Sequence, residues 1–155
     1  MLLKLVNLDN PILRLKAKEV EDFVHARQIV YDMYDTMIEN KGVGLAAPQV
    51  GFSLQLFITA KHPNIDSYMF KYKKPLPFNV FVNPSIIVAS GDVSGEEGCL
   101  SIPNTIVQVR RPALVSFEAD DLAGSRTQYT LINAWARIFC HEYDHLLGKL
   151  ITDFI

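Results

Sequence analysis

The spacing of apolar residues predicts an amphipathic helix near the start of the chain. Between Val24 and Glu39, apolar positions recur at steps of three and four residues, the repeat of a helix with one face on a core. The positions are Ala26, Ile29, Val30, Met33 and Met37. Asn40 and Gly42 follow where such a helix would stop. We therefore expect a long helix that ends near residue 40.

The middle of the chain shows short runs of β-branched and aromatic residues, separated by breaks that contain Pro or Gly. The runs are 54–59, 80–82, 85–89, 105–109, 113–117 and 126–131. No helical pattern comes between them, which favours antiparallel or mixed sheets over a doubly wound parallel sheet. Residues 61–78 are rich in Lys and Pro and have no period, so we expect a surface loop there.

A helical repeat returns in the last part of the chain. Four residues at steps of four, three and four share one face of this helix: Ala134, Ile138, His141 and His145. Asn133 is a candidate N-cap, and Gly148 is expected to end the helix in a left-handed turn.

The composition is that of an ordinary globular protein. The 155 residues are 49% hydrophobic and 21% charged, and we expect a single domain over residues 1–155. The net charge of -2 argues against direct binding of nucleic acid by phosphate neutralisation. No apolar run is long enough for a bilayer span, and the first nine residues do not resemble a signal peptide, so we expect no membrane contact and a cytoplasmic location. No uncovered apolar stripe requires a partner, so we expect a monomer.

The segment from His141 to His145 carries the sharpest chemical signal. Two histidines at positions i and i+4 of a helix can bind one divalent ion, and Glu142 beside the first can reach a metal-bound water. A catalytic site of this kind needs a third ligand and an open position. An Asp, a Glu or a thiolate could be that ligand. The chain then has an α+β fold, with mostly antiparallel or mixed sheets packed around a C-terminal metal-binding helix and a long N-terminal helix.

Two further stretches are rich in glycine. Cys99 lies in the segment 95–103 beside a glycine, although a cysteine in such a place is more often a small core residue. We expect Cys99 and Cys140 to be free thiols. The segment 42–51 predicts a backbone that comes close to another element or a ligand, but it is neither a dinucleotide nor a P-loop fingerprint. Gln49 is its one polar side chain, and by itself it is expected to bond its own backbone.

Together and in this order, the three stretches resemble the three signature motifs of peptide deformylases. They read Gly-Val-Gly-Leu-Ala-Ala-Pro-Gln, Glu-Gly-Cys-Leu-Ser and His-Glu-Tyr-Asp-His, and the resemblance extends from about Asn10 to the end of the chain. It implies a hydrolase that removes the N-formyl group from the N-terminal formylmethionine of nascent peptides near the ribosome and releases formate. It also implies one divalent metal ion, natively Fe(II) and as purified also Zn, Ni or Co, bound by Cys99, His141 and His145.

The resemblance implies roles for further residues. Glu142 would be the general base and acid on a metal-bound water. The side-chain amide of Gln49 and the backbone N–H of Leu100 would donate hydrogen bonds to the oxyanion. Backbone groups of three residues would bind an extended substrate: Val43, Gly44 and Gly98.

Two positions depart from the family pattern. Cys140 stands where Gln is common, and we expect it to pack rather than bind metal, because one helical step turns it about 100° away from His141. Ile106 stands where many members have Arg, which could change the affinity or preference for peptides.

Two alternative functions remain open at this point. The His-Glu-x-x-His pattern alone also permits a zinc endopeptidase, but such enzymes take their third ligand downstream, and only ten residues follow His145. The other alternative is a metal-binding or partner-binding module without chemistry. Glu142 and Gln49 argue against it, because a structural metal site needs neither a base nor an oxyanion donor.

Overall fold

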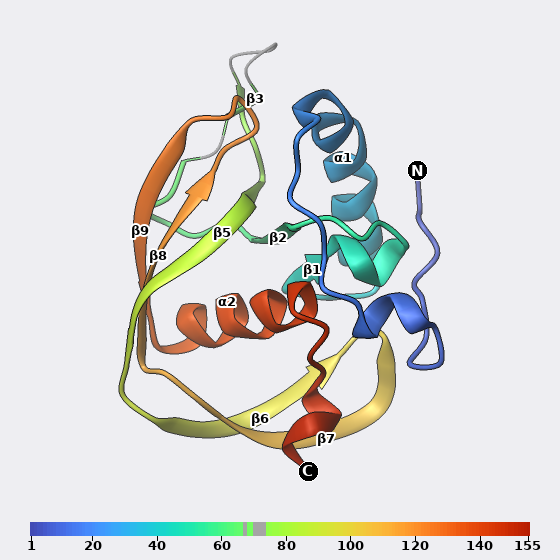
Figure 1. Cartoon of the computed structure of the whole chain (residues 1–155), viewed down its shortest axis with the longest axis vertical. Helices are drawn as coiled ribbons and strands as arrows, with labels where there is room; N and C mark the ends of the chain where they lie inside the picture. The colour runs from blue at the N-terminus through green and yellow to red at the C-terminus, as the bar shows by residue number, and fades with distance from the viewer. Residues whose placement is uncertain (67, 70–73) are drawn as a thin grey trace.

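The computed structural model describes residues 1–66, 68–69 and 74–155. Two α-helices and nine strands are formed by these residues, together with three short 3₁₀ helices (Figure 1). In chain order the elements are η1 Pro11–Arg14, α1 Phe23–Glu39, β1 Gly44–Ala46, η2 Ala47–Val50, β2 Leu56–Ala60, β3 Tyr68–Met69, β4 Lys74–Pro75, β5 Phe78–Ser90, β6 Val93–Cys99, β7 Ile102–Arg111, β8 Leu114–Asp120, β9 Arg126–Ile132, α2 Asn133–Leu146 and η3 Ile151–Phe154. None of the helices within the described ranges has the length and apolar character needed to cross a membrane.

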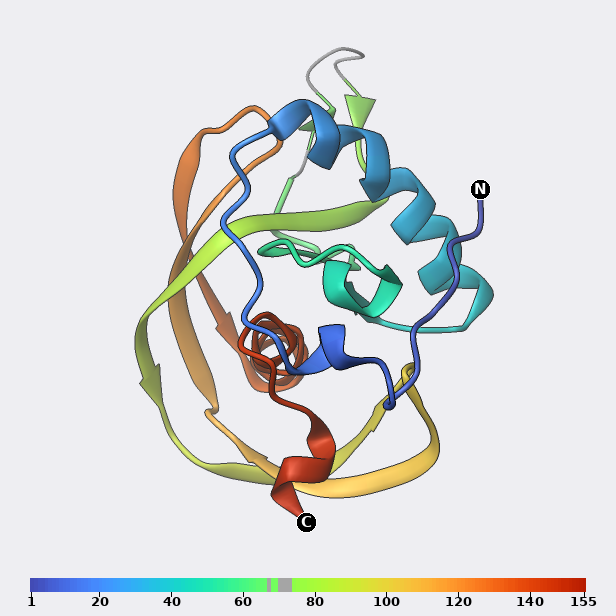
Figure 2. The ribbon, with the colours of Figure 1, turned by 45° about the vertical axis from the view of Figure 1, so that its right-hand side comes forward.

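The strands form one five-stranded sheet in the order β1-β2-β5-β8-β9 and two separate ribbons, β3-β4 and β6-β7. Every ladder between named strands in the described residues is antiparallel. This agrees with the expectation of antiparallel or mixed sheets. Helix α2 lies between the large sheet and the β6-β7 hairpin, and Figure 2 shows it almost end-on in the middle of the molecule. The sheet, the hairpin and the helix therefore surround one region.

Both faces of strand β2 are buried, which joins the two helices to the sheet. Leu56 and Ile58 belong to a core cluster with the buried face of α1, whereas Phe57 belongs to a second cluster with α2. Successive side chains of a strand point to opposite faces, so one short apolar strand supports both cores. The buried apolar residues of α1 are the predicted Ala26, Ile29, Val30, Met33 and Met37. Asp22 caps this helix by accepting a hydrogen bond from the backbone N–H of His25 at 3.1 Å.

Strand β5 differs from the sequence prediction, which divided it into 80–82 and 85–89. It runs unbroken from Phe78 to Ser90, with a register shift between Val82 and Ser85 where Asn83 and Pro84 lie. A proline is tolerated there because a bulge removes the need for its missing N–H. Asn83 has a φ of 50°, and its side chain accepts a hydrogen bond from the Val20 N–H at 2.8 Å. The Asn-Pro pair therefore bends a strand instead of ending it.

Three other features of the structure differ from the sequence prediction. Asn133 does not cap α2: it lies inside the helix, and no side-chain cap bond is formed at that end. Strands β1 and β6 were not predicted, because glycine and charged residues interrupt their apolar pattern. Within the loop expected over 61–78, the short strands β3 and β4 pair, and the remaining part at 67 and 70–73 lies outside the described residues. Gly148 was predicted correctly, with a φ of 75° just after α2.

Candidate active site

One face of helix α2 packs on the large sheet, and another carries two histidines. Ala136, Phe139 and Cys140 pack into the core cluster of the large sheet. The other face carries His141 and His145, whose rings lie 5.0 Å apart between centroids. Residues four apart on a helix point the same way, so the local backbone alone places the two imidazoles together. Cys140 is buried among apolar side chains, as expected, and both cysteines are free.

The third member of the cluster comes from the end of strand β6. Cys99, His141 and His145 each offer one ligand atom, and these atoms lie within 4.8 Å of one another. The Cys99 Sγ is 3.5 Å from the His145 Nε2. One sulfur and two nitrogens suit several divalent transition metals, and three protein ligands leave a coordination position open. The donor set therefore fits the metal that the sequence predicts.

A hydrogen bond orients His141. Its Nδ1 lies 2.9 Å from Oε1 of Glu97, so its Nε2 is left for the cluster. Carboxylates and carbonyls commonly hold metal-binding histidines in this way. For His145 the Nδ1 is buried, and it has no hydrogen-bond partner among the described residues.

Glu97 belongs to a buried network of charges behind the cluster. Arg111 donates to both Glu97 oxygens at 2.9 Å and to Asp144 at 2.6 Å, and Arg137 donates to Glu97 at 2.7 Å. Burial would raise the pKa of Glu97, but the hydrogen bonds from Arg111 and His141 outweigh it and lower the pKa to about 2. Glu97 is therefore a carboxylate at neutral pH and can hold His141.

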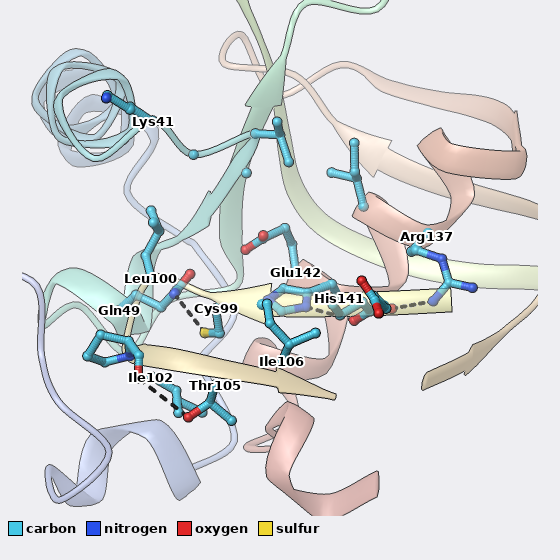
Figure 3. A pocket seen from close by; sticks show the side chains of 18 of the residues that line it. Lys41, Gln49, Cys99, Leu100, Ile102, Thr105, Ile106, Arg137, His141 and Glu142 are labelled. Atoms are coloured by element: carbon cyan, nitrogen blue, oxygen red, sulfur yellow. Dashed lines mark hydrogen bonds and ion pairs between the residues drawn. The ribbon is translucent and has the colours of Figure 1, made fainter. Parts of the chain in front are cut away.

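Gln49 faces the cluster in a fixed orientation. Its Oε1 accepts a hydrogen bond from the Ala46 N–H at 2.9 Å, so the amide nitrogen must point the other way. That Nε2 lies 3.5 Å from Cys99 Sγ (Figure 3) and 3.3 Å from Ser101 Oγ. The expected bond to its own backbone is thus present, and this bond aims the donor at the cluster.

Glu142 is the buried acid of the site. It is 4% exposed, and its Oε2 has no hydrogen-bond partner in the described part of the chain. Burial raises the pKa of Glu142 to about 7, although the nearby His141 acts in the opposite direction. Strand β1 passes directly above it: a Cβ on Gly44 would lie 2.5 Å from Glu142 Oε1. Only glycine leaves room for the carboxylate here.

One cavity of about 440 Å³ is lined by Gln49, Glu97, Cys99, His141 and Glu142, together with other residues. Residues of β1, β6 and β7 line it, and so does Ile138 of α2. Helix α2 also contributes Arg137, His141 and Glu142 (Figure 3). In the described residues β1 pairs only with β2, and β6 only with β7. Each strand therefore has one edge that no other strand of the described residues pairs with, although the Ala46 N–H and the Val93 carbonyl already bond Gln49 and Arg137.

The structure brings the predicted site residues together. The predicted residues that line the cavity are Val43, Gly44, Gln49, Gly98, Cys99, Leu100, His141 and Glu142, and His145 joins them through the donor cluster. The sequence interpretation missed Glu97, Arg111 and Arg137. Arg111 did carry a signal, because it continues the alternation of the buried Val107 and Val109 on β7, and a buried arginine requires an acidic partner.

Comparison with known proteins identifies the family of this chain. A family model described as polypeptide deformylase matches residues 2–155. The chain belongs to this family. It is therefore an enzyme, and its family consists of metalloenzymes that remove the N-formyl group from nascent peptides. The family assignment favours this activity over a zinc endopeptidase.

Individual relatives agree over nearly the whole chain. The peptide deformylase of Dictyoglomus turgidum is 38% identical over 154 residues, which cover 99% of this chain and 92% of the relative. The peptide deformylase of Finegoldia magna is 41% identical, and the match covers 99% of this chain and 90% of the relative. The crystal structure from Thermotoga maritima has a TM-score of 0.87 at 32% identity, with 100% and 98% covered. A Met-Ala-Ser-bound structure from Acinetobacter baumannii has the same TM-score at 34% identity, with 100% and 99% covered.

Proposed function

We propose that this chain is a metal-dependent deformylase in which Cys99, His141 and His145 hold one divalent ion and Glu142 transfers the protons. The observation that carries the proposal is the convergence of the three donor atoms within 4.8 Å, in a cavity that Glu142 also lines. A bound divalent ion supplies positive charge that acidifies water and polarises a carbonyl group. The negative thiolate of Cys99 offsets part of that charge.

Glu142 acts as the general base and then as the general acid. It takes a proton from the attacking water and gives it to the leaving amine, so the formamide C–N bond breaks into formate and a free N-terminus. Its pKa of about 7 without a cation suits a group that must both accept and donate a proton. A bound cation lowers this pKa, since positive charge favours the carboxylate.

Gln49 and Leu100 stabilise the negative oxygen that develops on the formyl group. The Gln49 Nε2 is held toward the cluster by the bond of its Oε1 to Ala46, so it needs little reorganisation when charge appears. The backbone N–H of Leu100, the residue after Cys99, is the second donor. Leu100 lines the same cavity.

The peptide binds extended between the free edges of β1 and β6. Backbone groups of Val43 and Gly44 face it from one side and those of Gly98 from the other, as when a strand is added to a sheet. The methionine side chain then enters the inner cavity above Arg137 and Ile138. The Acinetobacter baumannii relative, solved with Met-Ala-Ser, supports a tripeptide of this kind as ligand.

The proposals for the metal, the domain, the oligomeric state and the location rest on the sequence and on the relatives. We propose Fe(II) as the native ion, while Zn, Ni and Co fit the same donors. Residues 1–155 act as one catalytic domain and as a monomer, close to the ribosome in the cytoplasm. The bacterial relatives support that location, although a plant relative is named chloroplastic/mitochondrial.

The purified protein, loaded with Fe(II) or Ni(II), is expected to release formate from formyl-Met-Ala-Ser. Formate is measured with a coupled dehydrogenase, and the metal content of the same sample by elemental analysis. Acetyl-Met-Ala-Ser, which has a bulkier acyl group, serves as the control peptide. Absence of formate from a sample with one bound metal per chain would contradict the proposed function.

Replacing Cys99 by alanine is expected to remove or strongly weaken the bound metal, because one of three ligands and its negative charge are lost. Cys140→Ala is a matched control, since Cys140 lies one helical step from His141 but packs in the core. Elemental analysis after dialysis should show metal in the Cys140 variant and little in the Cys99 variant. Equal metal content in both variants would disprove the ligand assignment.

A further inference from the structure

Ile106 is an apolar side chain in an unusual position. It is 67% exposed, yet it lines the catalytic cavity from strand β7. Its neighbours in sequence differ, because Val107 and Val109 on the same strand are buried in a core cluster. An exposed isoleucine alone needs no explanation, but one that lines a substrate cavity can contact the substrate.

Gly98 has no side chain that would separate Ile106 from the substrate. A Cβ built on Gly98 would lie 3.4 Å from the Cδ1 of Ile106, so the isoleucine fills the space beside this glycine. Gly98 lines the cavity and is on β6, which in the described residues pairs with no strand but β7. A peptide along that edge would therefore have Gly98 as its neighbour and Ile106 just beyond it.

The alternation of side chains along a strand selects which peptide residue meets Ile106. Glu97 points to α2, where it is bonded to His141 and Arg137. The ladder shifts register between Glu97 and Cys99, but a Cβ on Gly98 would lie 3.4 Å from Ile106 Cδ1, so Gly98 faces Ile106 and not α2. The methionine of the substrate points toward α2 in the proposed binding mode. The residue after methionine consequently points to the opposite face, which is the face of Gly98 and Ile106.

We propose that Ile106 determines specificity for the substrate residue that directly follows formylmethionine, and that it favours an apolar side chain there. The inference rests on the proposed function and on the extended binding mode. Val43, which is 57% exposed, adds apolar surface to the cavity from the other wall. Glu96, which is exposed and also lines the cavity, makes an acidic side chain unfavourable at this position.

The test compares kcat/KM for formyl-Met-Leu-Ser and formyl-Met-Asn-Ser, whose second side chains are similar in size and differ in polarity. The wild-type enzyme is expected to favour the leucine peptide about tenfold, the low end for an apolar contact. In Ile106→Thr this ratio is expected to fall to about one, mainly through KM of the leucine peptide. The control is Ile87→Thr, the same substitution at an exposed isoleucine of β5 that does not line the cavity, and it should keep the wild-type ratio.

The outcomes test the role of Ile106 separately from the deformylase function. A wild-type ratio near one, or a tenfold ratio that survives Ile106→Thr, overturns the role of Ile106 while formate release still supports the deformylase function. A fall of the ratio in Ile87→Thr as large as in Ile106→Thr also overturns it. Absence of formate from both peptides with metal bound overturns the proposed function and this inference with it.

Discussion

Glu142→Ala is expected to lower kcat for formyl-Met-Ala-Ser by about 10²–10⁴-fold while the protein keeps its metal. Glu142 lines the cavity, and its buried Oε2 has no hydrogen-bond partner in the described residues. This oxygen is therefore available to accept a proton. It is not one of the three donors within 4.8 Å, so its removal leaves the ligands intact. Formate release and metal content are measured on the same preparation.

Two variants sharpen this experiment. Glu142→Gln keeps the shape of the side chain but cannot accept the proton, and it should be as inactive as the alanine variant. Glu39→Ala removes an exposed glutamate from the end of α1 and should keep full activity. Activity of Glu142→Gln close to that of the wild type would exclude Glu142 as the base.

Arg111→Met is expected to lower the free energy of unfolding by about 3–5 kcal/mol. Arg111 is 6% exposed and lies between Glu97 and Asp144, whose side chains are 5% and 15% exposed. Without the Arg111 guanidinium, Asp144 loses its ion pair with Arg111, and Glu97 loses two hydrogen bonds although it keeps the one from Arg137. Removing one partner of a buried network costs more than the net contribution of the network, since the remaining charge stays desolvated.

The neighbouring Arg110 provides the matched control. It is 75% exposed and pairs with the exposed Asp92 at 2.8 Å, and such a surface pair contributes about 0–1 kcal/mol. Urea denaturation of Arg110→Met and Arg111→Met at equal metal content measures the difference. Similar midpoints for the two variants would show that the Glu97 network does not stabilise the fold.

The effect of Arg111 should extend to the site. Its hydrogen bonds help to keep Glu97 ionised, and Glu97 in turn orients His141. The residues behind the metal donors thus connect the stability of the fold with the geometry of the ligands. This connection was absent from the sequence interpretation, because Glu97 and Arg111 are fourteen residues apart on two strands that had not been paired.

Some of the site could be predicted because its geometry is local. His141, Glu142 and His145 lie within little more than one helical turn, so the repeat of 3.6 residues alone determines their relative directions. The apolar stripe of α1 was predicted for the same reason. Strands β1 and β6 could not be predicted in this way, since glycine and acidic residues replace the alternating apolar side chains that mark a strand.

The sequence by itself determined the helical pair of histidines with its glutamate, and by resemblance it also named the other site residues. Only the tertiary structure decided how Cys99 reaches that pair, which way the Gln49 amide points and that Glu97 holds His141. The contacts of Cys99 with Gln49 and His145, and of Glu97 with His141, join residues 44 to 50 positions apart. Their distances depend on how the hairpin packs on α2. A local repeat fixes directions along one element, whereas packing between elements fixes the distances across the site.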